Sequence, residues 1–344
     1  MFENCKTFSD KWQIWKGIVV NMGKSTVIIP NYNGIKYIEA CLESLFIGTD
    51  TDFEVIVVDN ASRDGSLELV KEKFPQVTLI ENSENTGFDK AVNQGILASK
   101  TPYVILLNND TRVERSFVHE LEKAIEQSHK IFSVSAKMIA LHDKDKLDDA
   151  GDFYCALGWA FARGKGKKPD LYDKSCEIFA SCAGAAIYRR EIFDEIGLFD
   201  EEHFAYLEDI DIGYRAQLYG YQNIYAPRAI VYHAGSATSG SRYNAFKTKL
   251  ASQNSVYIIY KNMPLIQILI NLPFLCAGFL IKTLFFIKKG LGKEYISGLV
   301  SGIRLSASEK GKRHKVQFAG KRVRYYVKIQ CQLWGNLWRM IAQK

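Results

Sequence analysis

Short apolar runs alternate with amphipathic stretches along the first third of the chain. The runs are rich in β-branched residues and end in turn residues, which predicts strands over 26–30, 54–58, 77–80 and 103–107. Apolar residues then recur at helical spacing, which predicts helices over 35–46, after Ser62 or Asp64, over 88–98 and over 116–127. Four strand–helix repeats predict an α/β fold with a doubly wound, mostly parallel sheet, whose ligand lies at the carboxyl ends of the strands.

A later stretch, 205–218, places three carboxylates and one guanidinium within eight residues. In a helix, Glu208, Asp211 and Arg215 share one face, while Asp209 projects about 100° away from Glu208. Asp211 and Arg215 are then an i, i+4 ion pair, so a solvated helix face is one interpretation. Apolar residues surround the acids, however, and favour a partly apolar wall in which a carboxylate is tuned as a general base.

Near the C-terminus, residues 265–287 are mostly apolar and reach the length of a membrane span. Polar residues and a proline interrupt the run, and a single span would export the basic residues that follow, against the positive-inside tendency. We therefore predict that 241–344 is a basic, amphipathic helical region lying on an anionic membrane leaflet. The alternative is a helical hairpin packed on the rest of the chain, or on a second subunit in a homodimer.

Charge is distributed unevenly along the 344 residues. Residues 282–344 carry 15 Lys and Arg against two acids, so the net charge of +7 divides into +13 there and −6 in residues 1–281. A basic tail indicates an anionic partner, and the lack of any recognition motif beside the basic residues excludes nucleic acid as the expected one. Seven cysteines without CxxC spacing predict a reducing cytoplasm, which places the chain on the cytoplasmic face of the plasma membrane as a peripheral protein.

Polar residues gather where each predicted strand ends. The first turn reads PNYNGI and lacks the GxGxxG of dinucleotide-binding folds, which argues against NAD. Turn composition alone would place Asn and Asp at such positions. Four polar strand ends in register nevertheless predict a ligand site, and they contribute Asn31 and Asn33, Asp59 and Asn60, Asn85 and Gly87, and Asn108, Asn109 and Asp110.

The motifs IIPNYNG (28–34), VVDNASRDGS (57–66), NTGFDKAVNQG (85–95), LLNNDT (106–111) and LEDID (207–211) resemble, in order, those of family 2 glycosyltransferases. The resemblance covers about 24–235 and is strongest to the bacterial rhamnosyltransferase-like branch that builds surface polysaccharides. It implies a GT-A fold and transfer of a sugar from a nucleotide diphosphate, with inversion and one divalent metal ion. We therefore expect an N-terminal extension over 1–22 and a catalytic domain over 23–240.

The resemblance also implies a role for individual residues. Asp59 would accept the imide N–H of uracil or thymine, and the wider donor-binding set would be Pro30, Asn31, Tyr32, Asp59, Asn85, Gly87, Phe88, Asn93, Asn108 and Asn109. The metal motif DxD reads Asn108-Asn109-Asp110, so Asp110 is its remaining acid, and His233 would be the second ligand of Mg²⁺ or Mn²⁺. A half-buried histidine at a strand end is the alternative for His233.

In the mechanism that the resemblance implies, Asp209 is the base and Glu208 orients acceptor or sugar. Asp211 and Arg215 would hold the helix in place. The expected donor is dTDP-L-rhamnose, with a UDP-hexose or UDP-N-acetylhexosamine as the alternative, and the acceptor is a polyprenyl-linked or oligosaccharide glycan. A retaining route with a carboxylate nucleophile is a further alternative. A non-catalytic scaffold is another, motivated by the acid missing at Asn108.

Overall fold

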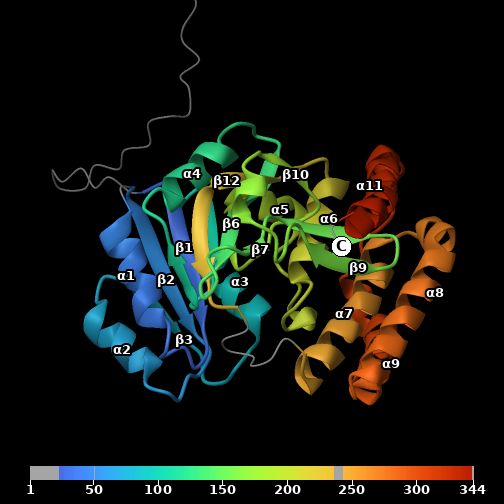
Figure 1. The fold of residues 1–344 in the computed structure, drawn as a ribbon, viewed down its shortest axis with the longest axis horizontal. Coiled ribbons are helices and arrows are strands. Elements are labelled where there is room, and N and C mark those ends of the chain that lie inside the picture. Colours follow the sequence, from blue (N-terminus) through green and yellow to red (C-terminus); the bar gives the residue numbers. More distant parts are fainter. Residues whose placement is uncertain (1–22, 50, 236–242, 343–344) are drawn as a thin grey trace, which may run out of the picture.

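The computed structural model describes residues 23–49, 51–235 and 243–342 (Figure 1). The predicted extension over 1–22 lies outside this part of the chain. A ten-stranded sheet forms the centre, and the C-terminal helices stand beside it, on the right in Figure 1. This arrangement confirms the predicted α/β class.

Four parallel strands lie in the order β3-β2-β1-β4, and the alternating N-terminal elements were all predicted. β1, β2 and β4 are short apolar runs rich in β-branched residues, as expected for strands buried on both faces, whereas the edge strand β3 is partly exposed. The strands are β1 (Ser25–Asn31), β2 (Phe53–Asp59), β3 (Thr78–Glu81) and β4 (Tyr103–Leu107). The helices are α1 (Ile38–Gly48), α2 (Ser66–Lys73), α3 (Phe88–Ala98) and α4 (Phe117–Ile125).

Beyond β4 the sheet becomes mixed. The order continues β11-β6-β12-β10, in which only β6 and β12 are parallel. The strands are β5 (Thr111–Val113), β6 (Ile131–Ala140), β7 (Leu147–Asp149), β10 (Cys176–Ile178), β11 (Ala185–Arg189) and β12 (Gln222–His233), with the separate hairpin β8 (Asp152–Cys155) and β9 (Trp159–Ala162). Short helices η1 (Pro169–Tyr172), η2 (Arg190–Ile192), α5 (Phe193–Ile196) and η3 (Glu201–His203) lead to α6 (Glu208–Leu218).

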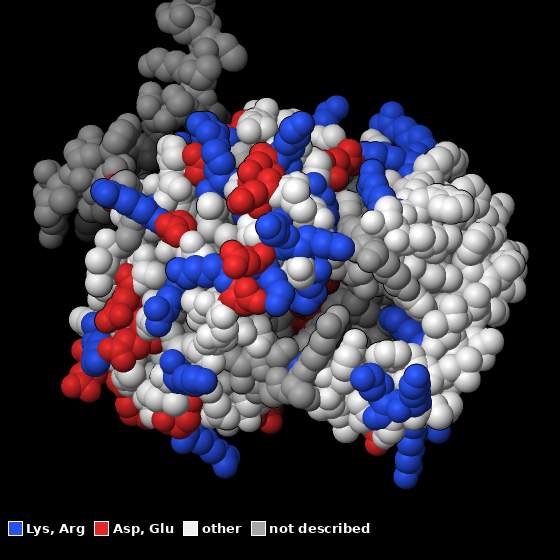
Figure 2. Space-filling view, in the orientation of Figure 1, with Lys and Arg blue, Asp and Glu red and all other residues white. Residues whose placement is uncertain are grey.

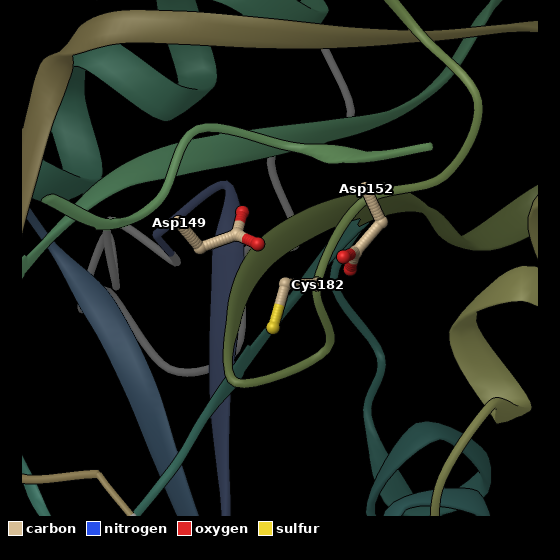
Figure 3. Close-up of side chains that lie close together, drawn as sticks. All are labelled: Asp149, Asp152 and Cys182. Atoms are coloured by element: carbon tan, nitrogen blue, oxygen red, sulfur yellow. The ribbon is translucent and has the colours of Figure 1, made fainter. Parts of the chain in front are cut away.

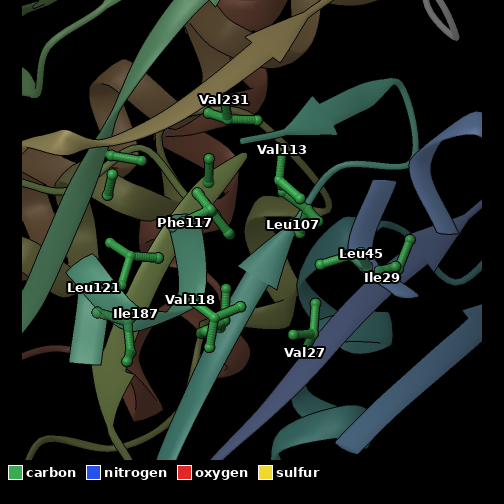
Figure 4. Packing of buried hydrophobic residues seen from close by; sticks show 14 of the residues in the cluster. Val27, Ile29, Leu45, Leu107, Val113, Phe117, Val118, Leu121, Ile187 and Val231 are labelled. Carbon is green, nitrogen blue, oxygen red and sulfur yellow. The ribbon is translucent and has the colours of Figure 1, made fainter. Parts of the chain in front are cut away.

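Apolar side chains fill both faces of the sheet. Val27 and Ile29 of β1 point towards α1 and α4, where they meet Leu45 and neighbours shown in Figure 4, while Ile28 points to the other face, towards α3 and α6. All three β1 side chains are fully buried. Each such side chain contributes about 1.5–3 kcal/mol on burial, so the sheet is a rigid platform for the polar residues at its carboxyl edge.

The C-terminal region is helical, as predicted, and shares a core with the sheet. Its helices are α7 (Ala245–Asn262), α8 (Leu265–Lys288), α9 (Gly292–Ala307), α10 (Glu309–Arg313), η4 (Gly320–Arg322) and α11 (Val323–Ala342). Ile258 of α7, Leu275 of α8 and Leu333 of α11 are buried in one cluster with Tyr154 and Tyr214. The predicted boundary near residue 240 therefore does not coincide with a break in packing.

Candidate active site

A strained turn presents the acids of the LEDID motif. Phe204, Tyr206 and Leu207 have φ of 63°, 69° and 70°, a left-handed conformation that costs non-glycine residues of order 1–3 kcal/mol each. The turn is held by Asn254 of α7, which donates to the carbonyls of His203, Ala205 and Tyr206 at 3.0, 2.9 and 2.8 Å. As a result, α6 begins at Glu208 and both predicted catalytic acids lie in its first turn.

Asp209 lies in a cluster of acidic groups. The main-chain N–H of Ile210 donates to its carboxylate at 2.7 Å, and the carboxyl group of Asp152 on β8 shares a hydrogen bond with it. Burial raises the pKa of Asp209, and burial together with the charges of Asp149 and Asp209 raises that of Asp152 well above its usual range. One proton shared between Asp152 and Asp209 is the arrangement that these shifts favour.

Two further groups adjoin this pair. Ligand atoms of Asp149, Asp152 and Cys182 lie within 4.8 Å of one another (Figure 3), close enough to enclose an ion. Each carboxyl group has a protein partner instead: Asp149 accepts from the Gly151 N–H at 2.6 Å, and Asp152 pairs with Asp209. Burial raises the pKa of Asp149 to about 7. Asp149 and Asp152 are therefore further buried acids with raised pKa values beside Asp209.

Glu208 acts electrostatically on a second buried acid, Asp89 of α3. One carboxylate oxygen of Glu208 and both oxygens of Asp89 are buried without a hydrogen-bond partner among the described residues. Burial and the charge of Asp209 raise the pKa of Glu208 to about 8, and burial and the charge of Glu208 raise that of Asp89 well above its usual range. Two carboxyl groups so placed do not ionise together at neutral pH.

The remaining charges of α6 are structural, as predicted. Asp211 accepts from Arg215 at 2.8 Å and from Lys261 of α7 at 2.9 Å, and all three side chains are buried. The Arg215 guanidinium also donates to the main-chain carbonyls of 196–198. The interpretation of this cluster as a solvated helix face is thus wrong, because the pair is enclosed by α7 and by the loop before residue 200.

Asn31 links three of the predicted donor-binding motifs. Its amide donates to Asp59 at 2.8 Å and accepts from Asn109 at 2.8 Å, and all three side chains are buried. Asp59 also accepts from the main-chain N–H of Ser62 at 2.9 Å. These bonds fix the Asp59 carboxylate at the carboxyl end of β2, beside Pro30 and the exposed Tyr32 at the end of β1.

The motif 85–95 forms the turn into α3. Asn85 accepts from the main-chain N–H of Gly87 at 3.0 Å, and Gly87 has a φ of 88°. The Phe88 N–H donates to the carbonyl of Phe204 at 2.7 Å, which ties this turn to the LEDID loop. Both ends of the Asn93 amide bond to the main chain of Phe199, at 2.8 and 3.1 Å, so its side chain positions the loop that leads to α6.

His233, at the end of β12, lies between two carboxylates. Its Nδ1 is 2.7 Å from Asp148 and its Nε2 is 3.2 Å from Asp110, while Lys165 pairs with Asp148 at 2.5 Å. Burial alone would lower the pKa of His233, but the hydrogen bonds with Asp110 and Asp148 raise it to about 9. A carboxylate on one ring nitrogen is the usual way to aim the other nitrogen at a metal ion.

The predicted pair Asp110 and His233 therefore comes together, and its donor set fits a divalent cation. Asn108 lies beside them, and its main chain is fixed by the carbonyl of Gly184 at 2.9 Å and the hydroxyl of Thr111 at 2.7 Å. Within the part of the chain that the structure describes, Asp110 is the acid of this motif that faces His233.

Comparison with known proteins decides the family. The model for glycosyl transferase family 2 matches residues 26–197, half of the chain. The chain belongs to glycosyl transferase family 2. The N-acetylglucosaminyl-diphospho-decaprenol L-rhamnosyltransferase of Mycobacterium tuberculosis is 24% identical over 239 residues, which cover 62% of this chain and 77% of that protein. The similarity supports the rhamnosyltransferase-like branch.

Solved structures show the fold of this glycosyltransferase to be GT-A-like. GalNAc-T7 with UDP, GalNAc and Mn²⁺ has a TM-score of 0.54 at 15% identity, covering 70% of this chain and 48% of that one. The mannosyltransferase PcManGT of Pyrobaculum calidifontis, in complex with GDP-Man and Mn²⁺, has a TM-score of 0.53 at 18% identity and covers 90% and 85%.

Four acids of the glycosyltransferase site were not predicted. Asp89, Asp148 and Asp152 adjoin residues that were, and Asp149 adjoins Asp152. The sequence signal was present, because DDAGD (148–152) packs three acids into a short segment between apolar residues. In the basic run that follows, Arg163 stacks on Tyr172 and Tyr225, and Lys165 pairs with Asp148, so both side chains are already engaged.

Proposed function

We propose that this enzyme transfers a sugar, by preference L-rhamnose from its dTDP donor, to a lipid-linked glycan by direct displacement, with Asp209 as the general base. The observation that carries the proposal is the Asp209 carboxyl group, presented by a strained turn and hydrogen-bonded to Asp152. The Mycobacterium tuberculosis relative, an L-rhamnosyltransferase by name, supports the donor. A UDP-hexose or UDP-N-acetylhexosamine is the alternative.

In the reaction, an acceptor hydroxyl attacks the anomeric carbon while the bond from that carbon to the nucleotide diphosphate breaks. Asp209 accepts the hydroxyl proton, and the leaving diphosphate carries away the electron pair, so the configuration inverts. A base with a raised pKa holds that proton more firmly than an ordinary aspartate does. Glu208, whose pKa is about 8 because of burial and the charge of Asp209, would orient acceptor or donor sugar as a neutral hydrogen-bond donor.

A metal ion would be held by Asp110 and His233, with Asp148 aligning the imidazole. When bound, Mg²⁺ or Mn²⁺ supplies Lewis-acid stabilisation of the diphosphate. Both structural neighbours were solved with Mn²⁺. One carboxylate and one imidazole leave most coordination positions to substrate oxygens and water, so we expect metal affinity to depend on bound donor.

The nucleotide would occupy the carboxyl ends of β1 and β2. Asp59, whose carboxylate is held by Asn31 and by the Ser62 N–H, would accept a pyrimidine imide N–H. That edge is common to uracil and thymine, so Asp59 alone does not select between dTDP and UDP donors. The N-terminal turn of α3, beginning at Phe88, adds main-chain donors of the kind that bind phosphates.

The membrane surface of this enzyme would be α8. Among the described residues, α8 is the one helix long and apolar enough to cross a membrane, and only 17% of its most apolar window is buried. Figure 2 shows a broad area without charged side chains on the side where α8 lies. Because α8 also packs on the sheet domain, we propose that it lies in the cytoplasmic leaflet as an interfacial helix, with Lys288 and Lys289 at its end.

The test is donor hydrolysis and binding across dTDP- and UDP-sugars, with Mn²⁺ or Mg²⁺ and then with EDTA. Metal-dependent selection of one donor supports an active transferase and names the sugar. A folded chain that binds none of them favours the scaffold, which the retention of Asp110, Glu208, Asp209 and His233 argues against.

A further inference from the structure

The hairpin β8–β9 and helix α8 meet at one closely packed point. The indole Nε1–H of Trp159 donates to the carbonyl of Gly278 at 3.2 Å, and the Lys282 ammonium lies 5.3 Å from the centre of the same indole. A Cβ at Gly278 would lie 2.2 Å from the carbonyl oxygen of Leu157 at the tip of the hairpin. Helix and hairpin are therefore locked together, and Lys282 has a fixed position between them.

Lys282 is a cation without a counter-ion. No carboxylate of the described residues forms an ion pair with it, although its side chain is half-buried in an apolar helix. Burial lowers the pKa of its ammonium group to about 8. A buried charge is normally paired, because its desolvation is otherwise uncompensated. Lys165 and the buried Lys261, by contrast, both have aspartate partners.

The surroundings of Lys282 specify what kind of anion fits. On α8, Phe285 lies one turn after Lys282 and Ile281 lies just before it, and they expose 38% and 51% of their surface, so an apolar chain can lie beside the ammonium group. Along the hairpin, Trp159 pairs with Cys155 and Ala162 pairs with Asp152. The two pairs lie three residues apart along the hairpin, a distance of about 10 Å. Lys282 therefore lies between the exposed apolar surface of α8 and Asp152, the hydrogen-bond partner of the proposed base Asp209.

We propose that Lys282 and Trp159 bind the diphosphate of a lipid-linked sugar acceptor, with the lipid along α8 and the sugar directed towards Asp209. This inference rests on the proposed function and names the part of the acceptor that the site recognises. Lysine binds phosphate as a point charge, and an indole suits the boundary between apolar chains and polar headgroups. The hairpin then sets the distance between the bound diphosphate and Asp209. An acceptor must therefore carry its diphosphate and its reacting hydroxyl at that spacing.

The test compares two acceptors in detergent with the full chain. One is a polyprenyl-diphosphate-linked N-acetylglucosamine, and the other is an octyl glycoside of the same sugar. For Lys282→Gln we expect the KM of the diphosphate acceptor to rise about tenfold or more, as for one charged hydrogen bond, with the octyl glycoside unaffected. Lys282→Arg should restore most of the affinity, and Lys174→Gln, at an exposed lysine of the sheet domain, should change neither KM.

Equal losses with both acceptors, or no change with either, would overturn the assignment. Binding to phosphatidylglycerol vesicles, measured without acceptor, tests whether Lys282 binds lipid headgroups instead. If Lys282→Gln weakens vesicle binding but leaves the KM of the diphosphate acceptor unchanged, Lys282 is a general headgroup contact and the proposal is wrong. An unaltered enzyme that transfers to neither acceptor would contradict the proposed function instead, so the two failures are distinct.

Discussion

The carboxyl group of Asp152, on β8, shares a hydrogen bond with the carboxyl group of Asp209 in the first turn of α6. The titratable groups around Asp209 are Asp152, Asp149, Cys182, Tyr188 and its neighbour Glu208. Lys165 is a cation whose charge acts on Asp149 and Asp152, but the pKa of Asp209 itself is set by burial and by hydrogen-bond donors. Asp152, whose pKa burial raises further, is the protonated partner that supplies one.

Removing that donor should shift the pH profile of the enzyme. A base acts only when ionised, so kcat/KM falls as the pH falls through its pKa, and burial already raises the pKa of Asp209. Asp152→Leu removes the donor, and we expect the acidic limb to move to higher pH by about one unit, the equivalent of one net hydrogen bond. Asp152→Asn keeps a hydrogen-bond donor, so the acidic limb should stay within a few tenths of a pH unit of its position in the unaltered enzyme. Identical profiles for the two variants would show that Asp152 does not assist the base.

The contact of Gly87 with Phe204 should be required for both stability and donor binding. Gly87→Ala adds a Cβ that lies 2.6 Å from the Phe204 carbonyl, at a φ of 88°. Gly197 has a similar backbone conformation, with φ of 81° and ψ of 161° against 88° and 170° at Gly87, and a Cβ there would lie 3.5 Å from its nearest neighbour, so Gly197→Ala measures the backbone strain alone. We expect Gly197→Ala to cost about 1–3 kcal/mol of unfolding free energy and Gly87→Ala clearly more. Urea unfolding of both variants checks this, and equal losses would mean that the contact is not a constraint.

Asp148 should control metal affinity although it lies behind the histidine. Its carboxylate holds Nδ1 of His233 at 2.7 Å, and loss of such a partner typically weakens metal binding about 10–100-fold. Asp148→Asn should therefore raise the Mn²⁺ concentration needed for half-maximal donor hydrolysis in that range. Asp145→Asn, at an exposed aspartate in the adjacent turn, is the matched control. An unchanged Mn²⁺ requirement in Asp148→Asn would argue against His233 as a ligand.

Membrane binding should depend on the exposed face of α8. Truncation before α8 is a poor test, because Leu275 and Leu333 of the C-terminal helices are part of the core. Leu280→Glu with Leu284→Glu changes only exposed positions, and we expect it to move most of the protein from the membrane to the soluble fraction. Leu171→Glu, at a leucine 72% exposed on the sheet domain, should stay with the membrane. Retention of the α8 variant on membranes would place the anchor elsewhere.

The sequence predicted the sheet, and which polar residues lie at its strand ends, because both depend on local pattern. The strand 103–107 and the helix 88–98 follow directly from apolar spacing and turn residues, and Asp110 and His233 follow from motifs at strand ends. The packing of α7 was not predictable in this way, since Asn254 and Lys261 reach residues about 50 positions earlier. Asp148 and Asp152 were missed for the same reason: their partners, His233 and Asp209, are brought beside them only by the folded sheet.

The central claim, that Asp209 is the base of an active transferase, is tested most directly by Asp209→Asn. Transfer to acceptor and binding of the nucleotide sugar are measured on the same preparation, with Asp194→Asn, at an exposed acid of α5, as the control. We expect transfer to fall at least 100-fold, as for loss of a general base, while donor and metal binding stay within about twofold. Substantial transfer by Asp209→Asn, with the fold intact, would contradict the account.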